Sequence, residues 1–209
     1  MSKLRLLPIV GLAIVLLLPM AAAQAQEDVE TSAQPATLEA VEDTRIEELT
    51  ALVPENLAGL PLRENLQAAT GEQLAEQMSD DERAVFEAML SANGKTLGDY
   101  AAANILVPIT DTDFIVLQPH RVSGIDAHAT IDAWVEILGL NAEQPRVVEQ
   151  VIAGRDVSLV SDDARPDFPL LHLFAGADVV WMVVAEDEAL VEEAVRTLTA
   201  TAPAAEVRD

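Results

Sequence analysis

Three pairs of apolar runs, each pair separated by a short polar turn, restrict the fold of this chain more than any other feature. The pairs cover residues 105–117, 146–161 and 170–185, and their runs are rich in Val, Ile, Leu and Phe. Strands joined by such short turns pair antiparallel, because a parallel pair needs a long crossover connection. The second pair is expected to turn at Gly154-Arg155. The sequence therefore predicts a mainly antiparallel sheet built from hairpins, and it excludes a Rossmann-type sheet.

Helical patterns follow these hairpins and place the chain in the α+β class. Ile131, Trp134 and Leu138 lie at helical spacing after Asp126, and a second apolar stripe ends at Leu198. From Ala101 onward the predicted order of elements is ββα and then ββββα. Because each helix is apolar on one side only, we expect the helices to pack on one face of the sheet.

N-terminal helices are predicted before the sheet. Apolar residues recur at helical steps over 38–53, and a proline then ends the pattern. Ser79 and Glu82 have the spacing of a capping box, which predicts the start of another helix. Asn93-Gly94 supplies a left-handed stop for that helix. Tyr100 is expected in the short segment that connects it to the first hairpin.

The run Val179–Ala185 lacks the polar alternation of a half-exposed strand. We therefore expect this strand to lie in the middle of the sheet and to be covered on both faces. Trp181 in this strand and Trp134 in the preceding helix are expected to be core residues. Pro108 and Pro119 cannot donate a ladder hydrogen bond, so both are expected at a sheet edge or a strand end.

The first 25 residues have the three regions of a signal peptide. Lys3 and Arg5 form a basic start, residues 6–20 are apolar, and Ala23-Gln24-Ala25 supplies the small residues of a cleavage site. We expect cleavage before Gln26 and an extracytoplasmic location, either periplasmic or secreted. The alternative is an uncleaved N-terminal membrane anchor, because the apolar stretch approaches the length of a bilayer span.

The rest of the chain divides into a spacer, one domain and a tail. Residues 26–37 are acidic and polar with few large apolar side chains, so they are expected to be a flexible spacer. Residues 38–200 are expected to form a single α+β domain, and 201–209 a frayed C-terminal tail. The chain contains no cysteine, which excludes a lipoprotein and a disulfide.

The charge of the chain is strongly negative. All 36 Asp and Glu residues follow the signal peptide, which leaves ten basic residues and a net charge of −26 after cleavage. Nucleic acids and anionic membranes bind clustered Lys and Arg, so both are excluded as partners. The acidic surface explains solubility, and it also leaves open a cationic or Ca²⁺-bearing partner.

The sequence contains none of the motifs that mark common enzymes. There is no G-x-S-x-G, H-E-x-x-H, Walker A or G-x-G-x-x-G segment. His120 and His172 are on predicted strands and His128 is on the central helix, and none has a partner at metal-ligand spacing. If hairpin pairing brought His120 and His172 together, they would be able to hold a metal with a nearby carboxylate.

Other polar residues are candidate ligands or nucleophiles. Asp111-Thr112-Asp113 and Asp162-Asp163 are acidic loop clusters, but neither matches an EF-hand, and turn geometry explains both equally well. Ser123, Ser158 and Ser161 have no His and acid partners that the sequence identifies. We therefore assign no catalytic, cofactor-binding or metal-ligating residue, and we expect no cofactor.

Three segments, LVPENLAGLPL (52–62), GRDVSLVSD (154–162) and DVVWMVVAEDEALVEEAV (178–195), carry a resemblance to other proteins. With these segments the chain resembles a loose group of uncharacterised exported bacterial α+β proteins of unknown function, over about residues 45–200. The resemblance implies a fold and a compartment, and no activity comes with it.

These observations together predict an exported, acidic, non-enzymatic binding module of the cell envelope or medium. Its partner is expected to be a small ligand or an envelope protein, bound through the sheet face or the hairpin loops. The alternative is a hydrolase-like enzyme whose site is assembled from His120, His172 and the loop aspartates. The sequence leaves the ligand and the oligomeric state open.

Overall fold

The computed structural model describes residues 44–109, 114–165, 168–176, 178–185 and 187–200. The expected signal peptide, spacer and C-terminal tail lie outside these residues. In the part of the chain that is described, no helix is both long and apolar enough to cross a bilayer. The helices and strands are, in chain order, α1 (Thr44–Leu52), β1 (Asn56–Leu57), β2 (Leu60–Pro61), β3 (Leu66–Thr70), α2 (Gly71–Ala75), α3 (Asp80–Ala92), β4 (Tyr100–Pro108), β5 (Phe114–Val122), α4 (Ala127–Leu140), β6 (Pro145–Ile152), β7 (Arg155–Asp162), β8 (Leu171–Gly176), β9 (Val179–Val184) and α5 (Glu188–Ala200).

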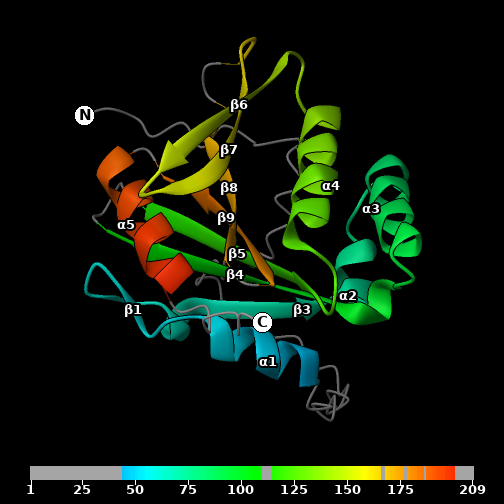
Figure 1. The fold of residues 1–209 in the computed structure, drawn as a ribbon, viewed down its shortest axis with the longest axis horizontal. Coiled ribbons are helices and arrows are strands. Elements are labelled where there is room, and N and C mark those ends of the chain that lie inside the picture. The colour runs from blue at the N-terminus through cyan, green and yellow to red at the C-terminus, as the bar shows by residue number, and fades with distance from the viewer. Residues whose placement is uncertain (1–43, 110–113, 166–167, 177, 186, 201–209) are drawn as a thin grey trace, which may run out of the picture.

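Seven of the strands form one antiparallel sheet in the order β3-β4-β5-β9-β8-β7-β6. The predicted α+β class and the ββα and ββββα order are confirmed. β9 lies in the middle of the sheet between β5 and β8, as its unbroken apolar run predicts. β3 and β6 are the two edges, and Figure 1 shows β6 at the far end of the sheet from β3.

Helices cover both faces of the sheet rather than the single face expected. α1 and α5 pack on one face with Trp181, whereas α3 and α4 pack on the other with Met182. Figure 1 shows α5 and the α3–α4 pair on opposite sides of the strands. The physical reason lies in the central strands, which are apolar at odd and even positions alike and so need a cover on each side.

Local sequence signals place the helix ends as predicted. The Ser79 N–H donates to Glu82 Oε2 at 2.7 Å, and the Glu82 N–H donates to Ser79 Oγ at 3.3 Å, which is a complete capping box. Asn141 Nδ2 also donates to Glu82 Oε1 at 2.7 Å, so the start of α3 is fastened to the end of α4. Gly94 has a φ of 67° and ends α3 in left-handed backbone.

The two strand prolines differ in position. Pro108 ends β4, as expected. Pro119 instead lies inside β5, a central strand, so the expectation for it was wrong. The pairing of β4 with β5 passes from Ala102–His120 to Ile105–Leu117 with no paired residues between them. This gap in the ladder accommodates a residue that has no N–H to donate.

Both tryptophans and Tyr100 are buried. Trp181 is 1% and Trp134 is 6% exposed, which confirms both as core residues. Tyr100 is fully buried at the start of β4 and is not a connecting residue, contrary to the prediction. β4 begins earlier than its apolar run, and its first residue packs against Phe86 of α3 with ring centroids 4.6 Å apart.

Candidate functional site

The hairpin of β6 and β7 is held by a two-residue turn. Ile152 pairs with Arg155, so the turn residues are Ala153 and Gly154. Their φ angles are 49° and 77°, which is the backbone of a type I′ turn. The expected turn at Gly154-Arg155 is thus displaced by one residue. Because a slip of one residue exchanges the two faces of a strand, the turn position decides which β6 side chains face α4.

One face of β6 carries exposed apolar side chains. Val147 is 43% and Val151 is 70% exposed, and Glu149 between them is exposed too. Val147 pairs with Val160, which belongs to the core cluster under α3 and α4. The three β6 side chains therefore continue the α4 face of the sheet to its edge, where they are exposed.

The same three residues present their backbone groups to the open side of the sheet. In a hairpin closed by a two-residue turn, the closing pair exchanges both backbone hydrogen bonds. Every second residue of β6, counted back from Ile152, therefore exchanges backbone hydrogen bonds with β7. Val147, Glu149 and Val151 alternate with them, so their N–H and C=O groups face away from the sheet.

β6 is the more open of the two sheet edges. It runs for eight residues, and among these only Pro145, at its start, lacks an N–H. β3, the other edge, has five residues and contacts α1. Natural edge strands are usually short, highly charged or covered, because an open edge pairs with other chains. An eight-residue edge with two exposed valines is thus a candidate binding surface, which we call the β6 edge (Val147, Glu149 and Val151).

His120 is built into the core. Its Nδ1 and the Tyr100 hydroxyl oxygen are hydrogen-bonded at 2.6 Å, and its ring lies 4.5 Å from the Trp134 ring. Burial lowers the pKa of His120 to about 3. Among the described residues, Nε2 of His120, Nε1 of Trp134 and Oδ1 of Asn104 are buried without a hydrogen-bond partner. In the folded chain His120 is therefore a neutral imidazole packed in the core.

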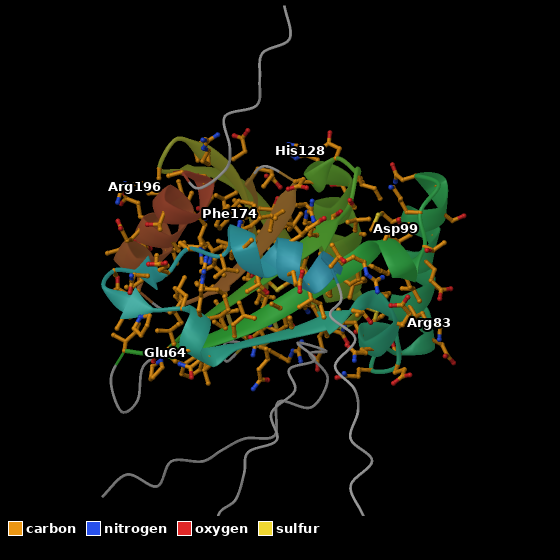
Figure 2. All side chains as sticks on the ribbon, turned by 90° about the horizontal axis from the view of Figure 1, so that it is seen from below. Glu64, Arg83, Asp99, His128, Phe174 and Arg196 are labelled. Atoms are coloured by element: carbon orange, nitrogen blue, oxygen red, sulfur yellow. The ribbon has the colours of Figure 1, made fainter. Side chains whose placement is uncertain are left out.

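His120 and His172 do not come together. His120 pairs with Val180 and His172 with Val183, two positions of opposite parity on β9. The two imidazoles therefore lie on opposite faces of the sheet. Burial also lowers the pKa of His172. Figure 2 shows His128 at the periphery of the molecule, where it is exposed in the first turn of α4.

The carboxylate of Asp162 accepts hydrogen bonds from neighbouring groups of the same chain. Its carboxylate accepts hydrogen bonds of 2.6–3.0 Å from Arg165 Nε and from the backbone N–H groups of Glu143, Gln144 and Ala164. Burial opposes the charged form, but these four bonds outweigh it and hold the pKa of Asp162 well below its usual range. Asp162 therefore fixes the loop between α4 and β6.

The other predicted candidates form no site in the described part of the chain. Asp163 is exposed and lies 3.9 Å from Arg146 Nη1, while Asp111 and Asp113 lie outside the described residues. Ser158 is buried in β7, and Ser123 and Ser161 are half-buried. Across the described ranges, no group of three or more His, Asp or Glu is arranged to hold a metal ion.

Comparisons with known proteins add nothing to this geometry. No protein-family model, curated protein or solved structure matches the chain. The fold and the β6 edge are therefore the features on which a functional argument can be built.

Proposed function

We propose that this protein is an exported, non-enzymatic binding module that takes up an extended segment of another protein along the β6 edge. The open edge with its exposed valines is the observation that supports the proposal. Strand addition to a sheet edge draws affinity from backbone hydrogen bonds and specificity from alternate side chains. The β6 edge offers both kinds of contact on the same three residues.

The proposal includes the compartment. We place the protein outside the cytoplasmic membrane, so that its partner is another protein of the envelope or the medium. The basic, apolar and small-residue regions of the first 25 residues support this location. N-terminal sequencing of the exported form should give Gln26 as the first residue. Recovery of the full-length chain in the membrane fraction would instead support the anchor.

A short synthetic strand tests the binding site. The probe is a fluorescent peptide, Thr-Thr-Val-Thr-Gln-Thr-Val-Thr-Thr, whose valines have the spacing of Val147 and Val151. It reads the same in both directions, so it tests antiparallel and parallel addition alike. We expect saturable binding by fluorescence anisotropy. N-methylation of alternate peptide nitrogens should abolish it, because strand addition depends on the backbone N–H groups.

A proline in the edge provides the matched protein variant. Val147→Pro removes an N–H that faces away from the sheet, so the hairpin keeps its own hydrogen bonds. We expect the variant to bind the peptide about tenfold more weakly, because one to two backbone hydrogen bonds to the peptide are lost. Its thermal unfolding transition should be largely unchanged. Unchanged peptide binding by Val147→Pro would refute the β6 edge as the site.

A further inference from the structure

We infer that the strand taken up at the β6 edge is basic, with a Lys or Arg opposite Glu149 between two apolar residues opposite Val147 and Val151. The inference rests on the proposed function and specifies the partner. It follows from the side chains of the edge, because residues that face each other across paired strands lie on the same face of the sheet.

The three edge side chains define a short complementary pattern. Their alternation places Glu149 midway between the exposed valines on the α4 face. A strand paired with β6 presents every second side chain to this face. Opposite charges and apolar pairs are favourable at directly opposed positions, whereas like charges are unfavourable. The pattern that fits is apolar, any residue, basic, any residue, apolar.

The two arginines of the hairpin do not reverse this preference. Arg146 is an even number of residues from Ile152, so their side chains lie on the same face of the sheet, and Arg155 is paired with Ile152 on that face. Both arginines therefore lie on the opposite face of the sheet from Glu149. A basic side chain opposite Glu149 meets a carboxylate and two valines on its own face.

A second copy of this chain fits the β6 edge poorly. An antiparallel pair of β6 strands that matches Val147 with Val151 of the other copy places Glu149 directly opposite itself. Like charges at opposed positions destabilise a strand pair. Each mature copy also carries a net charge of −26, so the two approach against long-range repulsion. A basic strand avoids both costs.

Charge across the rest of the fold favours the same partner. Several arginines of the described chain already form salt bridges with carboxylates of the same molecule. These salt bridges join Arg121 to Glu48 and Asp178, Arg165 to Asp162, and Arg196 to Glu192 and Glu193. The remaining acidic excess therefore produces a negative field that steers cationic segments toward the surface.

A charge series of the same peptide tests the inference. The central Gln of the peptide is replaced by Lys or by Glu, and binding is measured at low ionic strength. We expect the Lys peptide to bind about 2- to 30-fold more tightly than the Glu peptide, the range that one favourable and one unfavourable opposed pair imply. Added salt should reduce this ratio.

Two protein variants separate the local pair from the overall field. Glu149→Lys should reverse the preference, or reduce it toward unity. Glu64→Lys makes the same change in net charge beside the opposite edge, and Figure 2 shows Glu64 at the periphery of the molecule. This control should keep nearly the full preference. Equal losses in the two variants would show that Glu149 does not face the bound residue.

The outcomes distinguish the two proposals. Binding of the Gln peptide without any preference between Lys and Glu would refute the basic partner and leave strand addition standing. Failure of all three peptides to bind would refute strand addition itself. A preference for Lys that Glu149→Lys removes and Glu64→Lys keeps would support both proposals.

Discussion

Acid is expected to destabilise this protein through His120. The imidazole is buried and neutral, with a pKa of about 3 in the folded chain against 6.5 in an unfolded one. Between these two values the unfolded chain binds a proton that the folded chain does not. The free energy of unfolding therefore falls as the pH drops through this window, and the contribution of His120 is complete only above about pH 6.5.

The size of this effect follows from the two pKa values. Lowering the pH from 7 to 4.5 should remove about 2–3 kcal/mol of unfolding free energy through His120 alone. Domains of this size have about 5–15 kcal/mol in total, so the loss is readily measured. The partner of His120 is Tyr100, whose hydroxyl is bonded to Nδ1. Replacing both residues with Phe removes the titrating group and leaves no phenol without its partner.

Urea denaturation at pH 7 and 4.5 provides the assay. The difference in unfolding free energy between the two pH values should be about 2–3 kcal/mol smaller in Tyr100→Phe/His120→Phe than in the natural protein. His128→Gln, at an exposed position of α4, should keep the natural difference. His172 and the carboxylates are common to all three proteins and cancel. An identical pH difference in the double variant and the natural protein would refute the argument.

Four further predictions concern stability and metal binding. Trp181→Ala should cost about 3–5 kcal/mol, because it leaves a cavity in the middle of the sheet. Phe114→Ala, at an aromatic residue that is 53% exposed, should cost much less, and similar urea midpoints would contradict the assignment. Ser79→Ala should cost about 1 kcal/mol by loss of the capping box, while Ser91→Ala, at an exposed α3 position, should be neutral in a thermal melt. Asp162→Asn should lower the urea midpoint more than Asp163→Asn, because only Asp162 accepts four loop donors. Ca²⁺ should raise the melting temperature no more than Mg²⁺ at equal ionic strength, and a selective rise that Asp162→Asn abolishes would show a Ca²⁺ site.

Features that depend on a few neighbouring residues could be predicted from the sequence. The capping box of Ser79 and the left-handed Gly94 are local, and the structure confirms both. The central place of β9 was also predictable, because a strand without polar alternation must be covered on both faces. The same observation implies helices on both sides of the sheet. We expected them on one face because each helix is apolar on one side only, and that pattern does not tell which face of the sheet a helix covers.

Features that depend on distant residues could not be predicted. The edge position of β6 follows from β9 pairing between β5 and β8, and no local pattern encodes that strand order. The separation of His120 from His172 depends on the register of both strands against β9. Pro119 within β5 and buried Tyr100 were missed for the same reason, since their surroundings come from other parts of the chain.

The strand order has a consequence for how the chain reaches its native state. β9 joins the β3-β4-β5 segment to the β8-β7-β6 segment, yet it is the last strand to emerge from a ribosome. Until it arrives, β5 and β8 each lack a neighbour, and the two parts of the sheet share no strand. Cooperative folding therefore waits for nearly the whole chain, because the pairing that completes the sheet spans about 60 residues. Truncation before Val179 should therefore leave two fragments of sheet with unpaired strands.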